Sequence, residues 1–119
     1  MSTATILVIE DDLATAGLIR DALESEGYHV LHAIGDAGVA LARDGRPRVI
    51  LLDIDMPGMG GPEVSRHLRA DPQTMDIPIV CMSARDGRAH IPVDMLYDDC
   101  LPKPFRLAEL YAMVAHWIA

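Results

Sequence analysis

The chain has 119 residues, a length that suits one domain with a single hydrophobic core. Its formal net charge of -8 argues against direct DNA binding by this chain, because nucleic-acid-binding surfaces are usually basic. No apolar run approaches the roughly 20 residues of a membrane helix, and the N-terminus has no signal-peptide pattern. A cytoplasmic protein without membrane attachment is expected.

The two cysteines, Cys81 and Cys100, are too few for a disulfide framework or a zinc site. Cys81 lies in an apolar run and is interpreted as a small buried hydrophobic residue. The five histidines show no spacing typical of metal ligands, so structural roles are expected for them.

In the first half of the chain, strand patterns alternate with helix patterns. Ile6–Ile9 is a short β-branched run, typical of a strand that is buried on both faces. Leu13–Glu26 carries apolar residues at helical spacing, and Gly27 follows as a stop signal. Three further elements are predicted: a weaker strand over Tyr28–Ala33, a short helix over Asp36–Arg43 and a third apolar strand over Val49–Leu52.

The second half continues the alternation after a loop rich in Pro and Gly over Asp55–Gly61. The predicted elements are a helix from Pro62 to about Ala70, a fourth strand over Ile77–Met82, a short strand around Cys100–Leu101 and a final helix over Arg106–Ile118. Between the last two strands, Gly87 and Pro92 interrupt any helix. We therefore expect a fourth helix that is short, displaced or partly unwound.

Apolar strands that alternate with helices predict an α/β domain, in which helices cover both faces of a parallel sheet. Ligands of such sheets bind beyond the carboxyl ends of the strands. Chemically active side chains follow four of the predicted strands: Glu10-Asp11-Asp12, Asp53, Ser83 and Lys103. A parallel sheet would bring all of them to one edge.

Clustered carboxylates repel one another unless a cation intervenes, and a set of oxygen ligands suits Mg²⁺. A carboxylate beside Mg²⁺ can act as a nucleophile toward a phosphoryl group, while a lysine and a hydroxyl hold the phosphoryl oxygens. Each residue also has a structural interpretation: Asp12 as a helix cap, Ser83 as a turn residue and Lys103 as a surface charge. Their occurrence together at the strand ends favours the chemical interpretation.

Four motifs carry a family resemblance: ILVIEDD, VILLDIDMPGMGG, IPIVCMSAR and LPKPF. With them, essentially the whole chain resembles the receiver domains of bacterial response regulators. The resemblance implies a doubly wound, five-stranded parallel sheet of flavodoxin-like order 2-1-3-4-5. It also implies that residues 1–119 form one receiver domain, with no output domain in this chain.

The resemblance also assigns a metal site and a phosphorylated residue. It implies that Asp53 is the phosphoacceptor and that Asp11 and Asp53 bind Mg²⁺ through their side chains. Glu10 would reach the ion directly or through water, and the backbone carbonyl of Asp55 would be a further ligand. Without metal, repulsion among the carboxylates is expected to destabilise the fold.

Further implied roles concern the phosphoryl group and its donor. Ser83 and Lys103 would bind the phosphoryl group, and the Lys103-Pro104 bond is often cis in this family. The donor would be a phosphohistidine on a sensor histidine kinase or a histidine phosphotransfer protein. The domain would catalyse only its own phosphorylation and dephosphorylation, and would signal to a downstream protein by contact rather than act as a metabolic enzyme.

Four positions bear on regulation. Asp55 and Arg85 match the family positions that flank the route of attacking water, so an ion pair between them could slow dephosphorylation, although the interpretation as two solvated side chains is favoured over the pair. Cys100 occupies the position, three residues before the lysine, where receivers usually carry a Tyr or Phe that reorients on activation. A rotamer switch cannot operate there, and Tyr97 is a candidate to replace it.

Two alternatives stay open from the sequence. Asp53-Ile54-Asp55 also resembles the start of haloacid-dehalogenase-type phosphatases, in which the first Asp is the nucleophile and the second an acid-base. That interpretation is weakened by Pro57 and leaves the acidic pair at the first strand unexplained. The second alternative is a receiver-like binding module that is not phosphorylated, but such modules usually lack one of the site residues.

Overall fold

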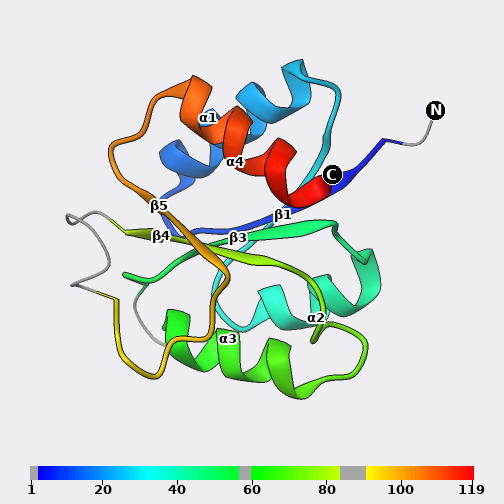
Figure 1. The fold of residues 1–119 in the computed structure, drawn as a ribbon, viewed down its shortest axis with the longest axis vertical. Coiled ribbons are helices and arrows are strands. Elements are labelled where there is room, and N and C mark those ends of the chain that lie inside the picture. Colours follow the sequence, from blue (N-terminus) through cyan, green and yellow to red (C-terminus); the bar gives the residue numbers. More distant parts are fainter. Residues whose placement is uncertain (1–2, 57–59, 84–90) are drawn as a thin grey trace.

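The computed structural model describes residues 3–56, 60–83 and 91–119. In chain order these residues form β1 (Thr5–Ile9), α1 (Leu13–Ser25), β2 (His29–Ala33), α2 (Ala37–Gly45), β3 (Val49–Asp53), α3 (Gly61–Ala70), β4 (Ile79–Ser83), β5 (Asp99–Pro102) and α4 (Leu107–Ile118). All strand pairs are parallel, and the sheet has the order β2-β1-β3-β4-β5 (Figure 1). The predicted fold class is confirmed.

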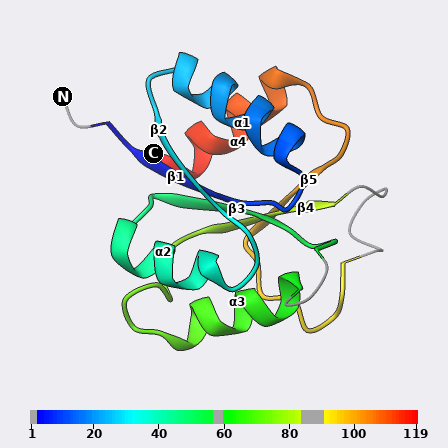
Figure 2. The same ribbon diagram turned by 180° about the vertical axis from the view of Figure 1, so that it is seen from behind.

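Helices cover both faces of the sheet. Helices α1 and α4 lie on one face and α2 and α3 on the other, and the view from behind shows the same two layers (Figures 1 and 2). Strand order changes direction between β1 and β3, because the chain leaves β1 for β2 on one side and later enters β3 on the other. The carboxyl ends of β1 and β3 therefore flank the switch point, where doubly wound sheets bind ligands.

The three central strands are buried on both faces. Ile6–Ile9, Val49–Leu52 and Ile79–Met82 are all 0% exposed, as their continuous apolar runs predict. Alternate residues belong to two core clusters: Leu7 and Cys81 pack toward α2 and α3, whereas neighbouring residues pack toward α1 and α4. This packing fixes the register of the strands and hence the positions of the side chains at their ends.

Turns at the strand ends are set by local contacts. Asp12 caps α1 by accepting hydrogen bonds from the backbone N–H of Ala14 and from the Thr15 hydroxyl, both at 3.0 Å. After β3, the first residue of α3 packs directly on the strand exit, since a Cβ atom on Gly61 would lie 2.9 Å from the Cα atom of Ile54. A glycine is needed here to bring α3 close to the end of β3.

Between β4 and β5, the described residues 91–98 contain a turn and no helix. The prediction that Pro92 prevents a regular fourth helix is thus confirmed for this segment, while Gly87 and Arg85 lie outside the described residues. Ile91 and Met95 are 8% and 5% exposed and pack into the core. Residues 91–98 therefore pack against the core as an irregular segment.

Side-chain contacts hold segment 91–98 against α3. The Ser65 hydroxyl accepts a hydrogen bond from the backbone N–H of Leu96 at 3.1 Å. Arg69 pairs with Asp98, whose carboxylate also accepts the backbone N–H of Ile79 at 2.8 Å. The segment is therefore attached both to α3 and to the start of β4.

Candidate functional site

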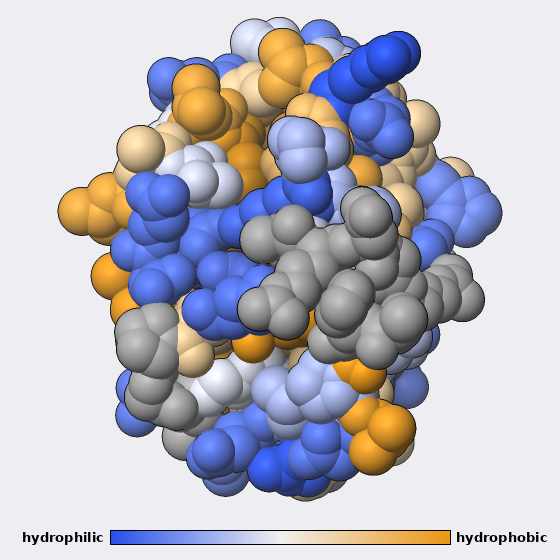
Figure 3. Space-filling view, turned by 90° about the vertical axis from the view of Figure 1, so that its left-hand side faces the viewer, coloured by the Kyte–Doolittle hydropathy of each residue, from blue (hydrophilic) through white to orange (hydrophobic). Residues whose placement is uncertain are grey.

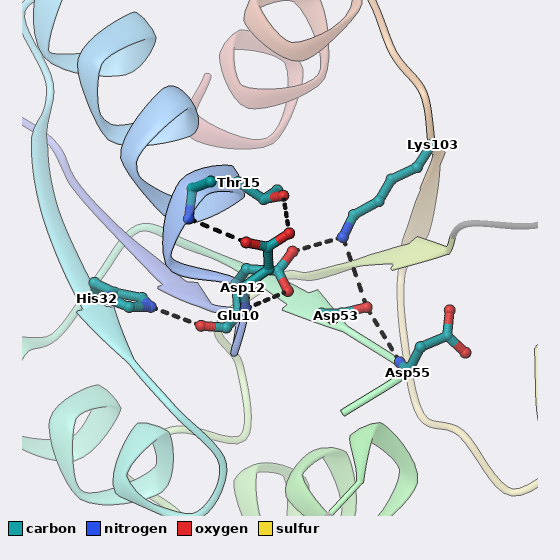
Figure 4. Close-up of polar contacts among 8 residues, drawn as sticks. Glu10, Asp12, Thr15, His32, Asp53, Asp55 and Lys103 are labelled. Atoms are coloured by element: carbon teal, nitrogen blue, oxygen red, sulfur yellow. Dashed lines mark hydrogen bonds and ion pairs between the residues drawn. The ribbon is translucent and has the colours of Figure 1, made fainter. Parts of the chain in front are cut away.

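The carboxyl ends of four strands meet at one edge of the sheet. Glu10 follows β1, Asp53 ends β3, Ser83 ends β4 and Lys103 follows β5. The side chains of Glu10 and Lys103 converge on Asp53 (Figure 4). In a space-filling view of this edge, hydrophilic residues gather left of the centre, with hydrophobic ones above them and to their left (Figure 3). The structure thus brings together residues that lie far apart in the sequence.

Three carboxylates form an acidic cluster, in which Glu10, Asp11 and Asp53 offer one oxygen each within 4.8 Å of one another. Glu10 is 1% exposed and Asp53 4%, while Asp11 is half-buried. Buried carboxylates at this spacing destabilise one another unless positive charge lies among them. Because the ligand atoms are all oxygens, the cluster fits a hard divalent cation such as Mg²⁺.

Lys103 supplies one positive charge to this cluster. Its Nζ atom donates to Oε1 of Glu10 at 2.5 Å and lies 3.8 Å from Oδ1 of Asp53. The Lys103–Pro104 peptide bond is cis, and the backbone N–H of Lys103 donates to the carbonyl of Ser83 at 2.6 Å. The ammonium therefore lies between the two buried carboxylates, within reach of an anion that binds at Asp53.

The two buried carboxyl groups differ in acidity. Burial raises the pKa of Asp53 to about 7, and a hydrogen bond with Glu10 adds to the effect. Burial also acts to raise the pKa of Glu10, but hydrogen bonds with Asp53 and Lys103 and the charge of the lysine outweigh it and lower that pKa. In the absence of metal, the pair therefore holds a proton on Asp53 rather than on Glu10.

Two further residues of the predicted site border Asp53. Ser83 is 1% exposed at the end of β4, the strand next to β3. Asp55 is exposed, and its backbone N–H donates to Oδ1 of Asp53 at 3.1 Å. Its carboxylate points away from the acidic cluster (Figure 4).

His32 contributes a contact that the sequence did not reveal. Its Nε2 atom lies 2.7 Å from the backbone carbonyl of Glu10, and the N–H of Glu10 donates to the carbonyl of Ala33 at 3.1 Å. Both contacts fix the backbone at the end of β1, and Figure 4 shows the one made by His32. Both contacts follow from the register of β1 and β2, in which Val8 pairs with His32. No local sequence motif predicts that pairing.

A groove of about 790 Å³ opens beside the site, between α1 and α4. Lys103, Pro104 and Phe105 contribute to its lining, and residues of both helices form the rest; Thr15, Asp21 and Ser25 are polar, and most of the others are apolar. Among these, Leu18 is 71% exposed and Leu107 54%. Exposed apolar side chains gathered in a groove are typical of a protein-binding surface.

Comparisons with known proteins agree on one family. Residues 6–115 match the family model of the response regulator receiver domain. Response regulator MprA of Mycobacterium sp. (strain KMS) is 40% identical over 110 residues, which cover 90% of this chain and 47% of that protein. Response regulator PleD of Caulobacter vibrioides is 39% identical over 115 residues, or 94% of this chain and 25% of that protein. The chain spans about half the length of MprA and a quarter of that of PleD.

Solved structures give the same result. The receiver domain of the sensor histidine kinase PA1611 from Pseudomonas aeruginosa PAO1 superposes with a TM-score of 0.90 at 28% identity, covering 98% of both chains. That crystal structure has a magnesium ion coordinated in the active-site cleft. The chemotaxis response regulator CheY4 of Vibrio cholerae shares the fold, with a TM-score of 0.88 at 24% identity and coverage of 98% and 99% of the two chains.

In the described residues, every helix is too short or too polar to cross a bilayer. The family match extends over nearly all of the sheet and its helices, from β1 into α4. The sheet has the strand order that the family resemblance implied. The acidic cluster and the cis Lys103–Pro104 bond lie at the positions of the sequence motifs. The chain belongs to the family of response regulator receiver domains, the phosphoacceptor switches of two-component signalling.

Proposed function

We propose that this receiver accepts a phosphoryl group on Asp53 from a phosphohistidine, in a reaction that requires Mg²⁺. The observation that carries the proposal is the position of Asp53: it is buried at the switch point of the sheet, within 3.8 Å of a lysine ammonium and beside two further carboxylates. An isolated buried aspartate would only destabilise the fold. Here the surroundings suit a nucleophile whose product is a larger anion.

The chain's own residues divide the chemistry among them. When bound, Mg²⁺ neutralises negative charge on the carboxylates and on the phosphoryl oxygens. Ionised Asp53 forms a bond from its carboxylate oxygen to phosphorus, while the bond from phosphorus to the donor's imidazole nitrogen breaks and that nitrogen keeps the electron pair. Lys103 exchanges its contact with Glu10 for a phosphoryl oxygen, and Ser83 holds another.

In this proposal Asp11 and Asp53 bind the metal through their side chains, Glu10 does so directly or through water, and the carbonyl of Asp55 completes the protein ligands. The support is the oxygen donor set of the acidic cluster and the magnesium ion in the active-site cleft of the PA1611 receiver. The Asp55 carboxylate and Arg85 remain the proposed modulators of dephosphorylation, although Arg85 lies outside the described residues.

A sensor histidine kinase or histidine phosphotransfer protein would supply the phosphoryl group, and we propose that an apolar surface of this donor occupies the α1–α4 groove. Lys103 and Pro104 are part of the groove's lining, so a phosphohistidine that enters the site brings its own protein against these two helices. The exposed Leu18 and Leu107 offer apolar surface for that contact. The downstream target is another protein, which reads the phosphorylated state by contact.

Intact-mass spectrometry after incubation with acetyl phosphate and Mg²⁺ tests the proposal. The wild type should gain one phosphoryl group, and chelation of Mg²⁺ should abolish the gain. Asp53→Asn should gain none, whereas Asp44→Asn, which alters an exposed carboxylate on α2, should behave as the wild type. Full labelling of Asp53→Asn would refute the assignment.

The two alternative functions make different predictions in the same assay. A haloacid-dehalogenase-type phosphatase that uses Asp53 and Asp55 would turn over generic phosphate esters many times, but that assignment leaves the position of Lys103 and the family match unexplained. A receiver-like module that is not phosphorylated would remain unlabelled at every donor concentration. Stoichiometric labelling without ester turnover separates the proposed function from both.

A further inference from the structure

Cys81 and Cys100 lie side by side on one face of the sheet. Cys81 is on β4 and Cys100 is on β5, and the register of these parallel strands pairs the two residues directly. Both pack into the core cluster on the α2–α3 face, so their side chains point to the same side of the sheet. Both are thiols.

The backbone geometry permits a disulfide between them. Neighbouring strands lie about 4.8 Å apart, and disulfides join residues whose Cα atoms are about 4.4–6.8 Å apart. The Cβ atoms of a disulfide are closer, at about 3.8 Å, so the two strands would have to draw together slightly. A bond formed against such resistance is more easily reduced than a structural disulfide, as reversible regulatory disulfides are.

Solvent reaches one of the two cysteines but not the other. Cys81 is 0% exposed, whereas Cys100 is half-buried and can meet an oxidant from solution. With hydrogen peroxide as the oxidant, the Cys100 sulfur takes up one oxygen to give a sulfenic acid and releases one water. The sulfur of Cys81 then bonds to that of Cys100, and the hydroxyl leaves as a second water with the proton of the Cys81 thiol.

We propose that Cys81 and Cys100 form a reversible disulfide that couples oxidation to the phosphorylation site. Cys81 lies two residues before Ser83, and Cys100 three residues before Lys103. The strands also meet beyond the pair, where the carbonyl of Ser83 accepts the backbone N–H of Lys103 at 2.6 Å. A covalent link between β4 and β5 therefore changes the relative position of the two residues that, under the proposed function, hold the phosphoryl group.

Intact-mass spectrometry and peptide mapping test the disulfide itself, without reference to phosphorylation. Reduced wild type treated with hydrogen peroxide should lose two hydrogen atoms and both of the thiols that react with maleimide after denaturation, since Cys81 is buried in the folded protein. It should yield a linked Cys81–Cys100 peptide and regain both thiols with dithiothreitol. Cys81→Ala and Cys100→Ser should form no intramolecular link. Retention of both thiols, or oxidation only to sulfinic acid or to disulfide-linked dimers, would overturn the pair.

Coupling to the site is tested by labelling with acetyl phosphate and Mg²⁺ before oxidation, after oxidation and after reduction. The labelling rate should fall by roughly ten- to a hundred-fold on oxidation, the scale on which small displacements of catalytic groups act, and recover on reduction. Cys100→Ser, given the same peroxide, controls for methionine oxidation and should keep its own rate. An equal rate in oxidised and reduced wild type would overturn the coupling, whereas failure of reduced protein to label would refute the proposed function and leave the disulfide result standing.

Discussion

Asp53 and Glu10 show how the same burial can act differently on two neighbouring carboxyl groups. Lys103 lies 2.5 Å from Glu10 but 3.8 Å from Asp53, so the ammonium favours ionisation of the first more than of the second. The pKa of Asp53 rises to about 7, mainly through burial, while that of Glu10 falls below its usual value. A bound divalent cation would stabilise the ionised form of Asp53 and lower its pKa.

This difference predicts a pH-dependent stability of the metal-free protein. Between pH 4 and pH 7, folded Asp53 keeps a proton that it loses on unfolding, so its contribution to the unfolding free energy falls as the pH rises. Asp53→Asn removes this contribution. The unfolding free energy of the variant, minus that of the wild type, is measured by urea unfolding without metal. This difference should therefore increase by on the order of 2 kcal/mol from pH 4 to pH 7, with no further increase above pH 8. If the difference in unfolding free energy between the two proteins stayed constant with pH, the raised pKa of Asp53 would be contradicted.

Single residues also show the limits of inference from sequence. The positions of Glu10, Asp53, Ser83 and Lys103 could be predicted because each ends or follows an apolar strand, and the carboxyl ends of parallel strands all lie on the same side of a sheet. The contact of His32 with Glu10 could not be assigned, because it depends on strand register. The same is true of the pairing of the two cysteines, which the sequence alone places in unrelated segments.

Among the elements, the strands were more predictable than the boundaries and the connection between β4 and β5. The fourth strand begins at Ile79 rather than at the predicted Ile77, since Pro78 precedes it and its carbonyl accepts the backbone N–H of Ile50 outside the strand. Pro92 indicated an irregular fourth helix, but it did not predict how residues 91–98 pack. The contacts of segment 91–98 with α3 join groups that are remote in sequence, so no local pattern predicts them.

Arg69 should control the order of segment 91–98. Its guanidinium donates to the carbonyls of Met75 and Ile77 at 2.9 and 2.7 Å and pairs with Asp98. In Arg69→Ala, the Asp98 carboxylate, which accepts the backbone N–H of Ile79, loses its ion pair. Hydrogen–deuterium exchange should therefore accelerate across residues 91–98 and at Ile79. Arg66→Ala is the matched control: it breaks the exposed pair with Asp94, worth about 0–1 kcal/mol. Equal exchange in the two variants would show that core packing alone holds the segment.

The α1–α4 groove yields a prediction about donor recognition. Leu18→Glu places a charge on the apolar surface and should slow transfer from a protein donor, because a charge buried in that contact loses its hydration. The donor for the assay is the autophosphorylated kinase that labels wild type fastest in a purified panel. Acetyl phosphate should label Leu18→Glu at the wild-type rate, and Met75→Glu, which alters an exposed hydrophobic residue outside the groove, should leave both rates unchanged. Normal kinase transfer to Leu18→Glu would exclude the groove.

At the scale of the whole molecule, folding and metal binding are linked by the acidic cluster. The apolar strands hold Glu10 and Asp53 at the sheet edge whether or not a cation is present. Once Asp53 is ionised, above its pKa of about 7, repulsion within the cluster therefore opposes the packing of the core. A ligand that binds only the folded state relieves this opposition by mass action. The whole domain should therefore respond to Mg²⁺, and not only the loops at the site.

Thermal unfolding measures this linkage. Mg²⁺ at about ten times its dissociation constant should stabilise the wild type by about 1.4 kcal/mol and raise its Tm accordingly. Asp11→Asn removes one carboxylate of the cluster and should lose most of the increase. Asp12→Asn is the neighbouring control, since asparagine also caps helices and Asp12 lies outside the cluster. The same Tm increase in Asp11→Asn and Asp12→Asn would contradict the metal site.

The central claim, that Asp53 carries the phosphoryl group, is tested most directly by chemical trapping. Borohydride reduces an aspartyl phosphate to homoserine, and peptide mapping then locates the modified residue. After incubation with acetyl phosphate and Mg²⁺, we expect homoserine at position 53 alone, in proportion to the phosphoryl group gained. Homoserine at Asp11 or Asp55, or a phosphorylated protein that yields no homoserine, would contradict the central claim.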